Sequence, residues 1–189
     1  GAADDDAPAY CPSGTFAAPD GSGCRACDRG GYFLNEPGKM GWHSHCACSP
    51  CNNGTFSNAA GAKDQARDCM VCPPGTDTSA PAGYRACACL PDSSRTDRFG
   101  PCANCQGLPG VNCTQDSRRT QTGHWWRFET PQMQADYTAF ANNLVLSYDY
   151  NRSLSSYTGK MPPVYPCPRK ENCLGGIDSA CRAGTTGPL

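Results

Sequence analysis

Hydrophobic residues follow a helical spacing shortly after Thr130 and Pro131. The apolar side chains there recur at intervals of three and four residues and so fall on one helical face: Met133, Tyr137, Phe140, Leu144 and Tyr148. Threonine is a favourable N-cap, and proline is a favourable first helical residue. Further on, apolar residues alternate with polar ones, as in a strand: Leu144, Leu146, Tyr148 and Tyr150. The pattern predicts a helix over residues 131–143 and a strand over residues 144–150.

Residues 1–113 are dominated by small and polar side chains and contain a weak internal repeat. Each repeat reads Cys-x-x-Gly-Thr, then a turn-rich stretch, then Cys-x-x-Cys or Cys-x-Cys, and the repeats begin at Cys11, Cys51 and Cys72. Glycine three residues after a cysteine allows a turn with positive φ, and a Thr-Phe pair can begin a short strand. The stretches between cysteines are rich in Gly, Ala, Ser, Asp and Pro, which favour turns over helices.

The cysteine content indicates the fold class. The chain has 189 residues and 16 cysteines, 13 of them within residues 1–113, and a cysteine fraction of about 8–10 % is typical of a disulfide scaffold. Residues 114–166 contain no cysteine, but they contain nine of the 17 aromatic residues of the chain. We therefore predict a small disulfide-rich fold of tandem cysteine-rich modules, with short β-hairpins and few helices, plus one aromatic-rich mixed α/β insertion.

Charge and hydropathy exclude two classes of function. The chain has 16 basic and 17 acidic residues, so it offers no electrostatic basis for binding nucleic acid or an anionic membrane surface. Its longest aliphatic run, residues 144–146, is far shorter than the roughly 20 residues of a membrane-spanning helix. We expect no nucleic-acid partner and no membrane span in this segment.

The repeated Cys-x-x-Gly-Thr…Cys-x-x-Cys pattern of residues 10–113 resembles the cysteine-rich modules of ephrin receptors and tumour-necrosis-factor receptors, which are related to the EGF-like fold. The stretch that begins at Cys181, Cys-x-x-Gly-x-x-Gly, resembles the end of an EGF-like module, in which another cysteine commonly follows. The resemblance implies an extracellular ladder of disulfides, and we expect the chain to be part of a longer protein.

With this resemblance, the chain divides into four segments. Residues 1–50 are expected to form the first cysteine-rich module, and residues 51–113 the second and third. Residues 114–166 are expected to form the cysteine-free aromatic insertion, and residues 167–189 a partial EGF-like module.

The even number of cysteines allows complete pairing in an oxidising compartment. We predict that all or nearly all of them form disulfides: Cys11, Cys24, Cys27, Cys46, Cys48, Cys51, Cys69, Cys72, Cys87, Cys89, Cys102, Cys105, Cys113, Cys167, Cys173 and Cys181. Closing each repeat onto the next cysteine pair predicts three bridges: Cys11–Cys24, Cys51–Cys69 and Cys72–Cys87. Continuing the same order along the chain predicts two more, Cys89–Cys102 and Cys105–Cys113. Cys27 is expected to pair with either Cys46 or Cys48.

Three Asn-x-Ser/Thr triplets begin at Asn53, Asn112 and Asn151, each in polar, loop-like sequence. Such triplets are acceptors of N-linked glycans in secreted proteins. At Asn112, early disulfide closure at the neighbouring Cys113 competes with modification. The chain opens without a signal peptide, so we interpret it as a mature or excised segment of a secreted or cell-surface protein.

The Cys-x-x-Cys pairs also have the spacing of zinc ligands, and His43 and His45 lie beside Cys46. The density of cysteines in turn-rich sequence favours disulfides instead, so we predict no metal and no cofactor. A zinc protein or an enzyme remains as an alternative class. The chain contains no nucleophile elbow, metalloprotease helix or phosphate-binding loop, and we predict that it is not an enzyme.

Trp125, Trp126 and Arg127 form the candidate interface. Aromatic residues and arginine are enriched at protein interfaces, and Arg118 and Arg119 precede them closely. Adjacent residues of a strand point to opposite faces. We therefore expect one tryptophan to fill the local core with Phe140 and Tyr148, while the other reaches a partner.

These features predict a non-catalytic segment of a secreted or cell-surface glycoprotein that acts in adhesion, in recognition or as a spacer. Its expected partners are other protein chains or modules and N-linked glycans. The alternative is a structural subunit of an extracellular filament or sheath, for example a glycoprotein of flagellar hairs.

Overall fold

The structure is a computed structural model that describes residues 11–42, 44–83, 87–146 and 150–183. The chain forms two compact units. Unit 1 comprises Gly1–Pro73 and Asp77–Ala88, and unit 2 comprises Pro74–Thr76 and Cys89–Leu189. Each unit combines more than one of the four segments expected from the sequence.

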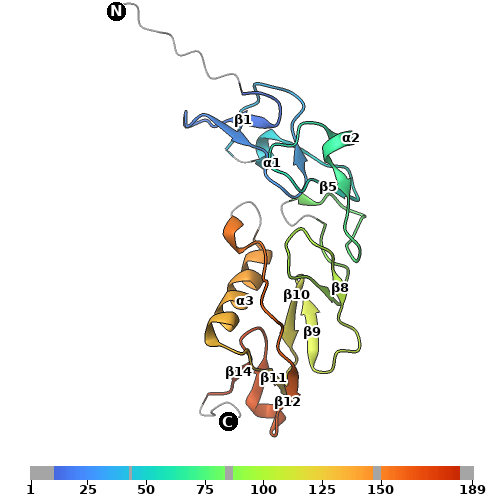
Figure 1. Cartoon of the computed structure of the whole chain (residues 1–189), viewed down its shortest axis with the longest axis vertical. Coiled ribbons are helices and arrows are strands. Elements are labelled where there is room, and N and C mark those ends of the chain that lie inside the picture. The colour runs from blue at the N-terminus through green and yellow to red at the C-terminus, as the bar shows by residue number, and fades with distance from the viewer. Residues whose placement is uncertain (1–10, 43, 84–86, 147–149, 184–189) are drawn as a thin grey trace, which may run out of the picture. The chain divides into compact units, whose positions relative to one another are not determined.

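Unit 1 is a series of short antiparallel hairpins (Figure 1). They are β1 (Thr15–Ala17) with β2 (Cys24–Ala26), β3 (Tyr32–Phe33) with β4 (Ser49–Pro50), and β5 (Thr55–Phe56) with β6 (Met70–Val71). Two four-residue helices, α1 (Ser44–Ala47) and α2 (Gln65–Asp68), lie between the strands. Within the described residues of unit 1, no strand exceeds three residues, because turn-forming residues interrupt the runs between cysteines.

The glycine of the repeat has the backbone conformation that its position predicts. Gly14, Gly54 and Gly75 have φ angles of 86°, 75° and 78°, a region that favours glycine. In unit 1, the carbonyl of Gly14 accepts a hydrogen bond from the Cys27 N–H (2.9 Å). A Cβ atom at Gly14 would overlap the carbonyl of Gly61. The glycine therefore provides both the turn and a close approach to the following loop.

Seven disulfides cross-link the chain, and they confirm the predicted fold class. Unit 1 contains Cys11–Cys24, Cys27–Cys48, Cys51–Cys69 and Cys72–Cys87; unit 2 contains Cys89–Cys102, Cys105–Cys113 and Cys167–Cys173. All five bridges inferred from the repeat are present, and Cys48 is the partner of Cys27. Disulfide bonding of this density indicates an extracellular or secreted protein.

Cys46 and Cys181 are free cysteines in the structure, which corrects their assignment to disulfides. Residues two apart on a helix do not share a face, so α1 exposes Cys46 while Cys48, just after the helix, is buried in its bridge to Cys27. Cys181 lies opposite Cys173 across a strand pair, but Cys173 is already bonded to Cys167.

The hydrophobic cores of unit 1 are small, and disulfide-bonded cysteines form part of them. One consists of Phe16, Cys27, Leu34, Ala47 and Cys48, and another consists of Phe33, Cys51 and Ala62. Such small clusters bury little apolar surface, so the cross-links supply stability that the cores cannot.

The described part of unit 2 contains four more two-stranded antiparallel sheets and one long helix. The strand pairs are β7 (Ser93–Ser94) with β8 (Ala103–Asn104), β9 (Val111–Thr114) with β10 (Ser117–Thr120), β11 (His124–Trp126) with β12 (Val164–Pro166), and β13 (Cys173–Gly175) with β14 (Ala180–Cys181). The helix is α3 (Pro131–Leu144), and the short 3-10 helices η2 (Arg152–Leu154) and η3 (Lys170–Asn172) follow it. Within the described residues, no helix is long and apolar enough to span a membrane.

The predicted helix is confirmed as α3. Thr130 caps it, because the Thr130 hydroxyl accepts a hydrogen bond from the Met133 N–H (3.2 Å), and Pro131 occupies the first helical position. The predicted apolar face is buried at Tyr137 and Phe140. The apolar residues at intervals of three and four therefore mark the face of α3 that packs into the core of unit 2.

The predicted strand over residues 144–150 is wrong in its described part. Leu144 is the last residue of α3, and Val145 is its C-cap. The guanidinium of the buried Arg98 donates hydrogen bonds to the carbonyls of Asn143 (2.8 Å) and Leu146 (2.6 Å). These carbonyls are satisfied by a side chain and not by a neighbouring strand. Residues 147–149, including Tyr148, lie outside the described residues.

Candidate functional site: the β11–β12 strand pair

The two tryptophans lie on β11, which pairs with β12 in antiparallel register. Trp125 lies opposite Tyr165, and Trp126 lies opposite Val164. Directly paired residues share one face of a two-stranded sheet, and successive residues alternate between faces. The β11–β12 pair therefore directs Trp125 and Tyr165 to one face and Trp126 to the other.

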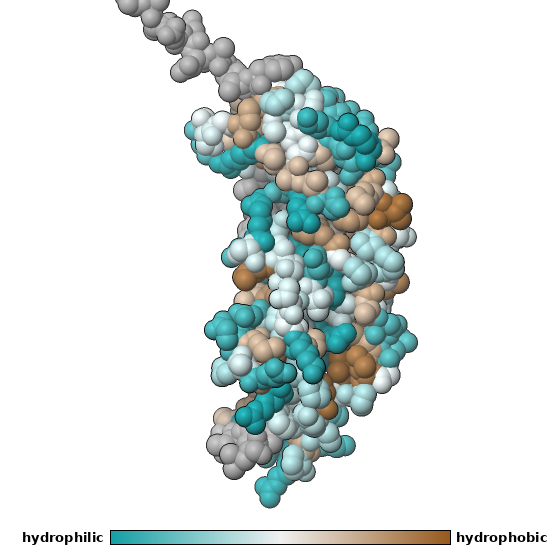
Figure 2. Space-filling model, in the orientation of Figure 1, coloured by the Kyte–Doolittle hydropathy of each residue, from teal (hydrophilic) through white to brown (hydrophobic). Residues whose placement is uncertain are grey.

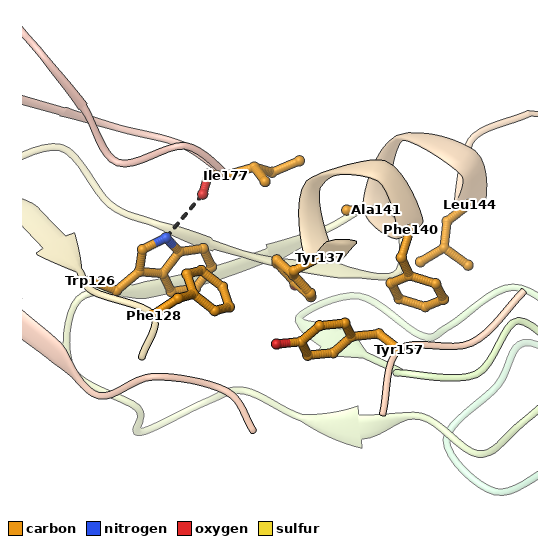
Figure 3. Packing of buried hydrophobic residues seen from close by; sticks show 8 residues of the cluster. All are labelled: Trp126, Phe128, Tyr137, Phe140, Ala141, Leu144, Tyr157 and Ile177. Carbon is orange, nitrogen blue, oxygen red and sulfur yellow. Dashed lines mark hydrogen bonds between the residues drawn. The ribbon is translucent and has the colours of Figure 1, made fainter. Parts of the chain in front are cut away.

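Trp126 belongs to the core of unit 2 and is only 4 % exposed. Its indole N–H donates a hydrogen bond to the carbonyl of Ile177 (2.9 Å), and its ring contacts those of Phe128 and Tyr137 edge-on. Figure 3 shows Tyr137 between this tryptophan and Phe140 on α3. The polar atom of the indole is satisfied inside the core, which is the usual condition for burying tryptophan.

Trp125 and Tyr165 form an aromatic pair on the opposite face. Their ring centroids are 5.3 Å apart. Trp125 is half-buried, and Tyr165 is 45 % exposed. The pair thus offers apolar area to a partner, together with an indole N–H donor and a phenolic hydroxyl.

The prediction that one of the two tryptophans fills the core is confirmed for Trp126. Trp126 and Phe140 belong to one buried cluster, as expected of the core tryptophan, whereas Tyr148 lies outside the described residues. The structure makes Trp125 the candidate for the interface. Its contact with a partner stays a prediction.

The arginines near the tryptophans lie at separate positions. Arg127 is exposed directly after β11. Arg119 donates a hydrogen bond from Nη2 to the side-chain oxygen of Gln115 (2.9 Å). Arg118 lines a groove beside this strand pair. Arg118 and Arg119 are successive residues of β10 and point to opposite faces, whereas Arg127 follows β11.

The groove has a volume of about 440 Å³ and is mostly apolar. Its walls come from the segment before β9, from β10 and β11, and from the segment that leads into β12. We name it the proline groove; its residues are Leu108, Pro109, Val111, Arg118, Trp126, Lys160, Met161, Pro162, Pro163 and Val164. Hydrophobic surface gathers in the lower half of Figure 2, on the side where β8 and β9 are drawn in Figure 1.

Sequence reasoning missed this groove. Its two apolar walls, around Pro109 and Pro162, lie about 50 residues apart in the chain and meet because β11 pairs with β12. The one indication of the groove in the sequence is the run Met161-Pro162-Pro163. Prolines cannot pair within a central strand, so the side chains of such a run lie at an edge or on a surface.

The three glycosylation triplets all have exposed asparagines. Asn53 donates a hydrogen bond from its amide to the carbonyl of Ser79 (2.9 Å). Asn112 lies on β9 beside Cys113, which is bonded to Cys105. Asn151 accepts a hydrogen bond from the Ser153 hydroxyl (2.8 Å). The accessibility that a glycan requires is present at all three positions, and their modification stays a prediction.

The two cysteines of each Cys-x-x-Cys motif, whose spacing resembles that of zinc ligands, belong to two different disulfides. Each sulfur of a Cys-x-x-Cys pair is bonded to a different cysteine, as Cys24 to Cys11 and Cys27 to Cys48 show. Within the part of the chain that the structure describes, no group of three or more potential metal ligands occurs. His43 and the side chain of His45 lie outside that part.

Comparison of the chain with protein-family models, with curated proteins and with solved structures found no match.

Proposed function

We propose that the chain is a non-catalytic extracellular module that binds another protein chain through the Trp125–Tyr165 face, in adhesion or recognition. The observation that carries the proposal is the pairing of two aromatic rings on the outer face of β11–β12, while Trp126 holds the inner face in the core. Two paired strands present these rings at little entropic cost, and tryptophan and tyrosine are among the residues that most often dominate interface energetics.

The resemblance to ephrin-receptor and tumour-necrosis-factor-receptor modules supports the same proposal. In such a module the disulfide ladder acts as a scaffold, and N-linked glycans at Asn53, Asn112 and Asn151 would cover surface that is not used for binding. The residues 118–128 concentrate aromatic and basic side chains, whereas the repeats expose mainly small and polar ones. The binding surface is therefore assigned to unit 2.

The two tryptophans provide a matched pair of variants. Trp125→Ala should weaken binding by roughly thirtyfold, about 2 kcal/mol, because it removes an interface anchor, and it should leave the melting temperature unchanged. Trp126→Ala should lower the free energy of unfolding by about 3–5 kcal/mol, because it opens a cavity in the core. Binding is measured as retention of labelled chain on the surface of the cells that secrete it, and melting by circular dichroism.

A photocrosslinker identifies the contact directly. Benzoylphenylalanine in place of Trp125 should yield a covalent product with a second polypeptide on intact cells, and the same group in place of exposed Leu174 serves as the control. If both alanine variants only lower the melting temperature and retention is unchanged, the Trp125–Tyr165 face is not a binding surface.

A second candidate function is a structural subunit of an extracellular filament. The observation that favours it is the separation of charge along the chain: unit 1 carries nine acidic and six basic residues, and unit 2 carries eight acidic and ten basic residues. Copies with opposite net charges on two units can attract one another head to tail. Sedimentation of the chain at rising concentration distinguishes a growing assembly from a monomeric module.

A further inference from the structure

The proline groove combines an apolar surface with uncompensated positive charge. Its volume falls in the range of natural ligand sites, and its two charged lining residues, Arg118 and Lys160, are both cations. Among the described residues, no carboxylate lines it. An apolar segment that carries negative charge is the ligand that such a groove fits.

Arg118 is held in place at the groove wall. Its backbone N–H donates to the Tyr137 hydroxyl (2.8 Å), and the same hydroxyl donates to the Arg118 carbonyl (2.9 Å). Its side-chain Nε donates to the Ser94 hydroxyl (3.1 Å). Within the described residues, the two terminal nitrogens of the guanidinium form no ion pair. They are free to bind a carboxylate in the two-pronged manner typical of arginine.

Lys160 supplies the second charge from another part of the lining, the segment that leads into β12. It is exposed, and its ammonium group has no ion-pair partner among the described residues. Met161 and Pro162 follow it directly and continue the apolar lining. Two cations on two walls are therefore available to an acidic segment that lies along the groove.

The chain itself contains a segment of this chemistry. Residues 1–10, which lie outside the described residues, read Gly-Ala-Ala-Asp-Asp-Asp-Ala-Pro-Ala-Tyr. They contain the only run of three acidic residues in the chain, followed by Pro8 and Tyr10. The carboxylates match Arg118 and Lys160, and proline and tyrosine match an apolar surface lined by prolines, methionine and tryptophan.

We propose that the proline groove of one copy binds the acidic segment, residues 1–10, of a second copy. The inference rests on the second proposed function, the filament subunit, and specifies its contact. Segment and groove are different surfaces, so the contact is heterologous, and every copy offers one of each. Such contacts propagate from copy to copy unless a ring closes them.

The first test measures assembly of the full chain by sedimentation velocity, after alkylation of the free thiols to prevent accidental disulfide dimers. The mean mass should rise with concentration, and a synthetic peptide of residues 1–10 should reverse the rise. The triple variant D4N/D5N/D6N should weaken association by tenfold or more, because it removes three charges and little volume. Raising the salt from 0.15 M to 0.5 M should weaken association of the native chain in the same direction.

A charge reversal tests the groove with a matched control. Lys160→Glu should weaken association at least fivefold, whereas Arg169→Glu, a reversal at an exposed position of unit 2 outside the groove, should leave it within twofold. Mixing the Lys160→Glu chain with a D4K/D5K/D6K chain should restore association between the two. This rescue requires the two surfaces to meet and does not follow from a change in folding.

Two results would overturn the proposal, and they can be told apart. If the native chain stays monomeric at all concentrations, the contact and the filament function both fail. If the chain assembles but D4N/D5N/D6N and Lys160→Glu assemble equally well, only the contact fails, and the filament function then depends on another surface.

Discussion

Tyr137 is the residue around which the aromatic cluster of unit 2 is built. It contacts four neighbouring rings at centroid separations of 5.1–6.3 Å, and burial raises the pKa of Tyr137 to about 12. The unfolded chain releases this proton near pH 10, whereas the folded chain retains it to higher pH. Ionisation of Tyr137 should therefore leave the free energy of unfolding independent of pH below pH 10. Between pH 10 and 12 it should lower the free energy of unfolding by about 2–3 kcal/mol.

The variant Tyr137→Phe isolates this effect from the titration of other groups. It should cost about 1 kcal/mol at neutral pH, because it removes the hydroxyl that bridges the Arg118 backbone, and its stability should decline less steeply above pH 10. Urea unfolding of the alkylated proteins, followed by tryptophan fluorescence, gives both profiles. Parallel profiles for the two proteins would show that Tyr137 ionises normally in the folded state.

At the scale of elements, the β9–β10 hairpin depends on a buried ion pair. Its turn residues Gln115 and Asp116 have positive φ angles of 53° and 64°, which such two-residue turns require. These angles are costly for residues other than glycine, asparagine and aspartate, and therefore for Gln115. Asp116 pairs with the buried Arg95 and accepts a hydrogen bond from the Cys89 N–H (3.1 Å). The turn is therefore stabilised by contacts outside the hairpin.

We expect Asp116→Ala to destabilise unit 2 by about 3–5 kcal/mol, because it removes the carboxylate that neutralises a buried arginine. The double variant Arg95→Met/Asp116→Asn should recover most of this loss, since it removes the buried charge and keeps a residue that tolerates positive φ. Urea titration of the three proteins measures the difference. A double variant no more stable than Asp116→Ala would contradict the assignment of the loss to the unneutralised charge of Arg95.

At the scale of the whole molecule, the cross-links divide the cysteines into fourteen that are bonded and two that are free. The denatured, unreduced chain should react with two equivalents of a thiol reagent. In the native chain Cys46 should react first, because it is exposed, and Cys181 more slowly, because it is partly buried. Peptide mapping after labelling assigns the two sites.

Two outcomes would contradict this arrangement. Ten or more reactive thiols would contradict a disulfide scaffold altogether, while labels on Cys48 in place of Cys46 would show that Cys27 has the other partner. The variant Cys46→Ser serves as the control, since it should lose one equivalent and keep the melting temperature of the native chain.

Several features of this protein were determined by the sequence alone because they depend on residues close together in the chain. The helix over residues 131–143 follows from apolar spacing and a local cap, and the turn glycines follow from their place after each cysteine. The five predicted bridges close loops of 8 to 18 residues, for which the next cysteine of the repeat is the nearest partner.

Other features were decided only by the tertiary structure, because distant residues make them. Trp126 is the core tryptophan since its N–H reaches the carbonyl of Ile177, 51 residues away. Residues after Leu144 do not continue as the predicted strand since Arg98, 45 residues before Asn143, binds the carbonyls at the end of α3. The proline groove exists since β11 pairs with β12. Alternating polarity near residue 144 could not reveal any of these contacts, because a local pattern carries no information on which remote donor or strand will satisfy a backbone group.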